Sequence, residues 1–231
     1  NLAIDGSKLL VLNGDVGLHP AMSKLKTVWD EGKLAIVEGV GYASPSFSHF
    51  TSMDIWQSAD PDGSLKDGWL GRYFDNLDAT QDVFSGLAVG RRLPLEVLST
   101  EIATPIVQSI ASYKLLGDRR YPGASDARTR ALLGLYSAPR QAPYSLLLDN
   151  TVQAMHSSSL ALQHIEEIYT SKVDYPDTPL ARSLQILAQT ITSGMGLKVG
   201  HVTIGGWDTH ANQLEDQQTL LETVDQAVYA F

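Results

Sequence analysis

Apolar side chains recur every three or four residues over several segments, and this spacing predicts amphipathic helices. The clearest helix starts at Thr178-Pro179, a capping residue followed by a first-turn proline, and ends before Gly194. Its apolar face is expected to consist of Leu180, Leu184, Leu187, Ala188 and Ile191. The same reasoning predicts helices over residues 20–32, 48–56, 69–77, 127–136, 144–170 and 214–231.

Short apolar runs between these helices predict strands. Residues 34–37, Leu-Ala-Ile-Val, contain no polar position and are expected to form a strand that is buried on both faces. Further strands are predicted over residues 9–11, 83–89, 95–98 and 197–204. Because strands alternate with helices over connections long enough for crossovers, the fold class is expected to be α/β, with a mostly parallel central sheet flanked by helices.

The length of 231 residues is enough for one large domain, and residues 1–231 are expected to form a single domain. Within it, the strand-free stretch from about 127 to 193 is expected to be a helical layer or cap. Hydrophobic residues make up 43% of the chain, so it can bury a core. The chain starts at Asn1 and stops at Phe231 inside a predicted helix, as expected of an incomplete domain from a longer protein.

Charge and composition exclude several classes of function. The net charge of −9 gives a surface that repels nucleic acid and anionic membranes. No stretch reaches the roughly 18–20 apolar residues of a membrane span. There is no cysteine, which excludes disulfides, thiolate metal sites and a cysteine nucleophile. The expected partner is therefore a small molecule or another protein.

The first candidate site follows the strand predicted at 197–204, where the chain reads Gly-Gly-Trp-Asp-Thr-His from Gly205 to His210. Ligands of α/β sheets gather beyond the carboxyl ends of the strands. Asp208 offers an anionic oxygen and His210 a neutral nitrogen, which together suit zinc or manganese. The alternative interpretation is that Asp208 caps the next helix and that His210 only contacts the backbone.

The second candidate site is the turn Ser44-Pro45-Ser46-Phe47-Ser48-His49, which brings three hydroxyls and an imidazole into six residues. A serine there could act as a nucleophile activated by a metal ion or by His49. Ser-Pro-Ser is equally ordinary turn chemistry, and Ser48 could simply cap the helix that begins after it.

The remaining histidines are weaker candidates. His156 and His164 lie on one predicted helix but are separated by two turns, which is too far for both to bind one metal ion. His201 lies inside a predicted strand and is expected to be a packed side chain.

At the two candidate sites the chain resembles a known family. The first block is GLHPAMSKLKTVWDEGKLAIVEGVGYASPSFSHFTSMDIW followed by GWLGRYFD, and the second is GGWDTHANQ followed by an amphipathic helix. Both resemble the bacterial domain of unknown function 1501 family. The resemblance covers Gly17–Asp75 and Val199–Phe231, whereas residues 79–177 match only in general pattern.

That family is similar to the alkaline phosphatase and sulfatase superfamily. The resemblance implies an alkaline-phosphatase-like fold and metal-dependent hydrolysis of phosphate or sulfate esters. It implies that Asp208 and His210 bind the metal ion, that Ser46, or else Ser44, is the nucleophile, and that His49 binds metal or substrate. It also implies a periplasmic or extracellular location and a small anionic ester as substrate.

The chain departs from the family pattern in several places. Phe47 stands where members commonly have an arginine that could hold an anionic substrate. Ala43 aligns near the sulfatase nucleophile and has no nucleophilic atom, which disfavours sulfatase activity. The Gly-Gly-x-Asp-Gly and Gly-Thr-Asp-His-Gly motifs of the family do not occur in this chain. An alternative function is therefore a non-catalytic binding or structural subunit of a secreted or cell-surface assembly that retains the fold.

Overall fold

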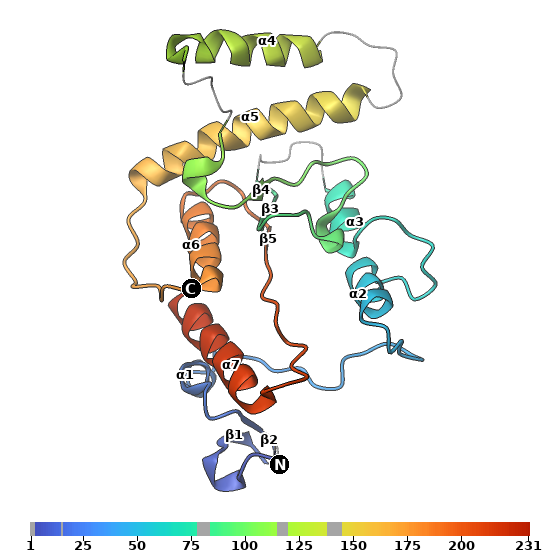
Figure 1. Ribbon diagram of the computed structural model, residues 1–231, viewed down its shortest axis with the longest axis vertical. Coiled ribbons are helices and arrows are strands. Elements are labelled where there is room, and N and C mark those ends of the chain that lie inside the picture. Colours follow the sequence, from blue (N-terminus) through green and yellow to red (C-terminus); the bar gives the residue numbers. More distant parts are fainter. Residues whose placement is uncertain (1–2, 15, 78–83, 115–119, 138–144) are drawn as a thin grey trace. The chain divides into compact units, whose positions relative to one another are not determined.

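The computed structural model describes residues 3–14, 16–77, 84–114, 120–137 and 145–231 (Figure 1). Within these residues the chain is a mixed α/β structure. It divides into two compact units. Unit 1 consists of Asn1–Gly41, Ser171–Ala188 and Val202–Phe231, and unit 2 consists of Tyr42–Thr170 and Gln189–His201.

Helices form close to the places that the apolar spacing predicts. The α-helices are α1 (Ser23–Asp30), α2 (His49–Ser58), α3 (Trp69–Asp75), α4 (Ser125–Ser137), α5 (Ser145–Ile168), α6 (Pro179–Thr192) and α7 (Gln213–Ala230). Thr178 caps α6 as predicted, because its hydroxyl accepts the Ala181 N–H at 3.2 Å. Leu180, Leu184 and Leu187 are buried, whereas Ile191 at the end of the predicted face is exposed.

The strands form one small hairpin and one small sheet. In unit 1, β1 (Leu10–Asn13) pairs antiparallel with β2 (Val16–Leu18). In unit 2, the order is β4 (Ile106–Val107), β3 (Gly86–Val89), β5 (Val199–Val202), with β3 and β4 parallel. A small parallel sheet flanked by helices is thus confirmed.

Two predicted strands are wrong. Residues 34–37 have no strand structure, and Val37 is 78% exposed instead of buried. A strand requires a neighbour that completes its hydrogen bonds, and no strand in the described residues pairs with this run. Residues 95–98 contain the 3-10 helix η2 (Leu95–Val97), which Pro94 precedes. The prediction for 83–89 is confirmed from Gly86 to Val89, and residue 83 lies outside the described residues.

The core of unit 2 forms where α3 and η2 pack on the sheet. Phe74 of α3, Ala88 of β3 and Val97 of η2 are each 1% exposed and pack together. A Cβ on Gly71 would lie 1.9 Å from the Leu98 carbonyl oxygen, so α3 and the chain after η2 touch backbone to backbone. Glycine is required at such a close approach. A Cβ on Gly68 would likewise lie 1.9 Å from the Leu95 carbonyl oxygen, so both glycines of the segment Gly-Trp-Leu-Gly are explained by close backbone contacts.

Arg72 joins the helices α2 and α3 of unit 2. Its guanidinium donates to the Ser58 carbonyl oxygen at the end of α2 (2.6 Å) and to the Asp67 carboxylate (2.8 Å). A cation at the C-terminus of a helix satisfies carbonyls that have no partner within the helix.

The core of unit 1 includes a contact between α1 and α7 (Figure 1). Asp225 of α7 is 2% exposed, and its carboxylate accepts the N–H groups of Lys24 (3.1 Å) and Leu25 (2.7 Å). The N-cap residue of α1, Met22, has no capping side chain, so α7 supplies the cap from 200 residues away.

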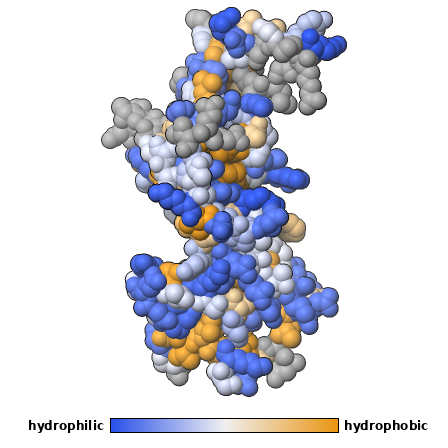
Figure 2. All heavy atoms as spheres, turned by 90° about the vertical axis from the view of Figure 1, so that its left-hand side faces the viewer, coloured by the Kyte–Doolittle hydropathy of each residue, from blue (hydrophilic) through white to orange (hydrophobic). Residues whose placement is uncertain are grey.

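Part of α7 remains apolar and exposed. Its exposed large hydrophobic residues are Leu214, Val228 and Tyr229. Figure 2 shows that hydrophobic side chains reach the surface among hydrophilic ones.

None of the described helices combines the length and apolar character needed to cross a bilayer. The described residues from 127 to 193 contain no strand, as predicted; their role as a cap stays a prediction.

Candidate metal centre

The loop between β5 and α7 in unit 1 carries the first candidate site. After β5 ends at Val202, the chain is extended and then turns at Gly206, whose φ of 92° is in the left-handed region that favours glycine. Two backbone hydrogen bonds between residues two apart follow, from Thr209 N–H to the Trp207 carbonyl (3.0 Å) and from His210 N–H to the Asp208 carbonyl (3.2 Å). These bonds fold the loop tightly, so that side chains two residues apart can meet.

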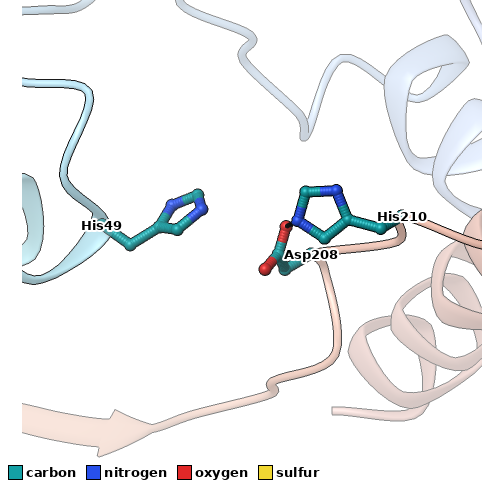
Figure 3. Close-up of side chains that lie close together, drawn as sticks. All are labelled: His49, Asp208 and His210. Atoms are coloured by element: carbon teal, nitrogen blue, oxygen red, sulfur yellow. Dashed lines mark ion pairs between the residues drawn. The ribbon is translucent and has the colours of Figure 1, made fainter.

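Asp208 and His210 are brought together by this loop (Figure 3). The His210 Nε2 atom lies 2.7 Å from the Asp208 Oδ1 atom. The two side chains are 83% and 59% exposed for His210 and Asp208, respectively. Both groups are accessible from solvent, and their role as metal ligands stays a prediction.

The donor set fits a borderline divalent cation. Zinc binds imidazole nitrogen and carboxylate oxygen at about 2.0–2.2 Å, which separates two ligand atoms of a tetrahedral ion by about 3.4 Å. The observed spacing of 2.7 Å between His210 Nε2 and Asp208 Oδ1 is shorter, because the two side chains contact each other directly. Both side chains are largely exposed, so their donor atoms are accessible to an ion from solvent.

The N-cap residue of the helix that follows is Asn212 and not Asp208. Asn212 is the N-cap residue of α7, with a left-handed φ of 51° and no hydrogen bond from its side chain to the helix. The interpretation of Asp208 as the N-cap residue of the next helix is therefore wrong, because the N-cap residue of α7 lies four residues later.

The serine turn of unit 2 is held by its own hydrogen bonds. The Ser46 N–H donates to the Tyr42 hydroxyl oxygen (2.8 Å), and the Ser48 N–H donates to Ser46 Oγ (3.2 Å). The Ser48 Oγ accepts the Thr51 N–H at 3.4 Å, which confirms that Ser48 caps α2. Ser44 is exposed, with a left-handed φ of 54°.

His49 is the first residue of α2 and is exposed. It belongs to unit 2, whereas Asp208 and His210 belong to unit 1; Figure 3 labels all three. The roles of Ser46 and Ser44 as nucleophiles and of His49 as a ligand stay predictions.

Sequence reasoning missed the partner of His201. The His201 Nε2 atom lies 2.5 Å from the Glu96 Oε1 atom, and both side chains are largely buried in unit 2. His201 is thus packed inside the fold, as predicted. Glu96 could not have been chosen as its partner, because 105 residues separate the two and η2 was predicted to be a strand.

Two groups of unit 2 have shifted pKa values. In the loop after α2, the Leu65 N–H donates to the Asp60 carboxylate (2.7 Å) and lowers the pKa of this group. Burial raises the pKa of the Tyr113 hydroxyl, which is bonded to Ser158 of α5. Both groups take part in hydrogen bonds within unit 2.

Comparisons with protein-family models, curated proteins and solved structures find no match to this chain.

Proposed function

We propose that this chain belongs to a metal-dependent hydrolase of phosphate-type esters that acts outside the cytoplasm. The observation that carries the proposal is the exposed Asp208–His210 pair, with nitrogen and oxygen donors 2.7 Å apart on one loop. The resemblance to the domain of unknown function 1501 family, and through it to the alkaline phosphatase fold, supports the reaction class.

His49 is proposed to bind metal or substrate, as the resemblance implies. Its exposed imidazole stands at the first position of α2 and offers a nitrogen donor. Catalytic zinc sites keep one coordination position open for water or substrate. A bound divalent ion would stabilise charge that develops on the transferring group.

Ser46 is the proposed nucleophile, and Ser44 is the second choice. Ser46 Oγ accepts a hydrogen bond from the Ser48 N–H, and this contact uses an oxygen lone pair. The hydroxyl proton is not engaged in that bond and can be transferred to a base. The same bond fixes the direction of the Ser46 side chain.

A second candidate function is protein binding without catalysis. Phe47 is 97% exposed and Phe50 is 86% exposed, on either side of Ser48 and His49. Exposed aromatic residues are typical of binding surfaces. This function predicts that the chain binds a partner protein whether or not a metal ion is present.

Metal content distinguishes the two functions. We expect the full-length protein to carry close to one zinc or manganese ion per chain, measured by elemental analysis after dialysis against metal-free buffer. Asp208→Ala and His210→Ala should each lower this content at least tenfold, because each removes a donor atom. His164→Ala, which removes an exposed imidazole of α5, is the matched control and should retain the metal.

The ester-hydrolase proposal fails if the folded wild-type protein carries and binds no divalent metal. If metal binds but Ser46→Ala and Ser44→Ala both leave the hydrolysis of aryl phosphate esters unchanged, the metal site stands and the proposed nucleophiles are wrong.

A further inference from the structure

Gln217 of α7 contacts both residues that flank Asp208. Its side-chain Nε2 atom donates to Thr209 Oγ1 at 3.1 Å and to the Trp207 carbonyl oxygen at 3.4 Å. An amide nitrogen carries two protons, so these two acceptors use the full donor capacity of the group. Gln217 lies one helical turn after Gln213, the first residue of α7, and therefore belongs to a regular element.

The burial of the loop alternates around this contact. Gln217 and Thr209 are half-buried, whereas Asp208 and His210 are exposed on either side of Thr209. The Trp207 indole N–H donates to the Ile204 carbonyl at 3.1 Å and anchors the other end of the loop. The hydroxyl of Thr209 therefore faces α7, while the two candidate ligands remain accessible.

We infer that Gln217 is the positioning residue of the metal centre: it holds the Trp207–Thr209 backbone so that Asp208 and His210 present their donor atoms together. The effect of Gln217 on metal affinity rests on the proposed metal-binding function. The positioning of the loop by Gln217 is a property of the metal-free chain and can be measured without a metal ion. Residues that orient ligands in this way typically change metal affinity by about 10- to 100-fold when they are substituted.

Gln217→Met tests the inference, because methionine has a similar length and helix propensity but no donor. We expect zinc affinity, measured by competition with a chromophoric chelator, to fall about tenfold or more. Amide hydrogen exchange at residues 207–210 of the metal-free protein should become faster. The matched control is Gln218→Met on the same helix, which removes only an exposed hydrogen bond to Glu222 and should change neither quantity.

Thr209 provides a second, independent test. Thr209→Val keeps the shape but removes the acceptor oxygen, and it should reproduce part of the loss of zinc affinity. Thr209→Ser keeps the hydroxyl and should rescue it. In the double variant with Gln217→Met, the two losses should not add, because they remove the same hydrogen bond.

The outcomes separate this inference from the proposed function. Unchanged hydrogen exchange at residues 207–210 in Gln217→Met overturns the positioning role, whatever the metal content. Faster exchange in a wild-type background that binds no zinc upholds the positioning role and overturns the proposed metal site. Faster exchange with unchanged zinc affinity overturns the link between the two.

Discussion

At the scale of single residues, glycines decide whether the backbones of unit 2 can meet. A Cβ on Gly71 would lie 1.9 Å from the Leu98 carbonyl oxygen, and a Cβ on Gly68 would lie 1.9 Å from the Leu95 carbonyl oxygen. The neighbouring atoms are backbone, which cannot rotate away as a side chain can. The position of Gly68 is also held by a hydrogen bond, because its N–H donates to the Leu98 carbonyl at 2.9 Å.

Gly71→Ala is therefore expected to destabilise unit 2 by about 1–3 kcal/mol or more, the usual cost of overpacking a core. The measurement is urea unfolding followed by circular dichroism. Gly134→Ala in α4 is the matched control, since a Cβ there meets no atom within 4 Å. Alanine inside a helix should stabilise the protein by about 0.5–1 kcal/mol at that position. Equal effects of the two substitutions would contradict the close approach of α3 and the chain after η2.

At the scale of elements, the contact of α1 with α7 depends on one buried carboxylate. Asp225 accepts two N–H groups at the start of α1, and anions are stabilised at helix N-termini. Lys24 of the same turn also lies 5.4 Å from the centre of the Tyr229 ring, a cation–π contact between the two helices.

Asp225→Ala should lower the free energy of unfolding by about 1–3 kcal/mol, because it leaves two N–H groups at the start of α1 without their acceptor. The amide hydrogen-exchange rate should increase first at Lys24 and Leu25. Glu222→Ala on the same helix, which removes only the Gln218 hydrogen bond, should be close to neutral. No change in exchange at Lys24 and Leu25 in Asp225→Ala would rule out the cap.

At the scale of the whole molecule, the net negative charge and the exposed apolar surface have opposite effects on self-association. The chain carries a net charge of −9 at pH 7 and has a pI near 5.0. It also exposes large apolar side chains in both units, including Val37, Phe47 and Phe50. Charge repulsion keeps such surfaces apart only while the net charge is far from zero.

Light scattering across pH 4–8 should therefore show most self-association near pH 5 and least above pH 7. The double substitution Phe47→Ser and Phe50→Ser should reduce the scattering at pH 5, because it removes two strongly exposed aromatic rings. Scattering that does not change with pH would mean that charge is not what keeps the molecules apart.

The parts of the candidate site that depend on residues close together in the sequence could be predicted. Asp208 and His210 are two residues apart after a glycine turn, so their pairing follows from the chain itself, and the structure brings them together. Gln217 gave no such signal, because a glutamine on a predicted helix is most simply a solvated side chain. The cap from Asp225 joins residues 200 apart and has no signature in either segment.

The sequence by itself determined the helices, because apolar spacing and caps act within a few residues. It also determined the net negative charge and placed Asp208 and His210 two residues apart in the loop before α7. Only the tertiary structure decided which apolar runs became strands. Residues 86–89 pair with neighbouring strands, whereas residues 34–37 pair with none of the strands that the structure describes. A strand is stabilised by hydrogen bonds to a distant segment, and no pattern within the strand specifies that partner.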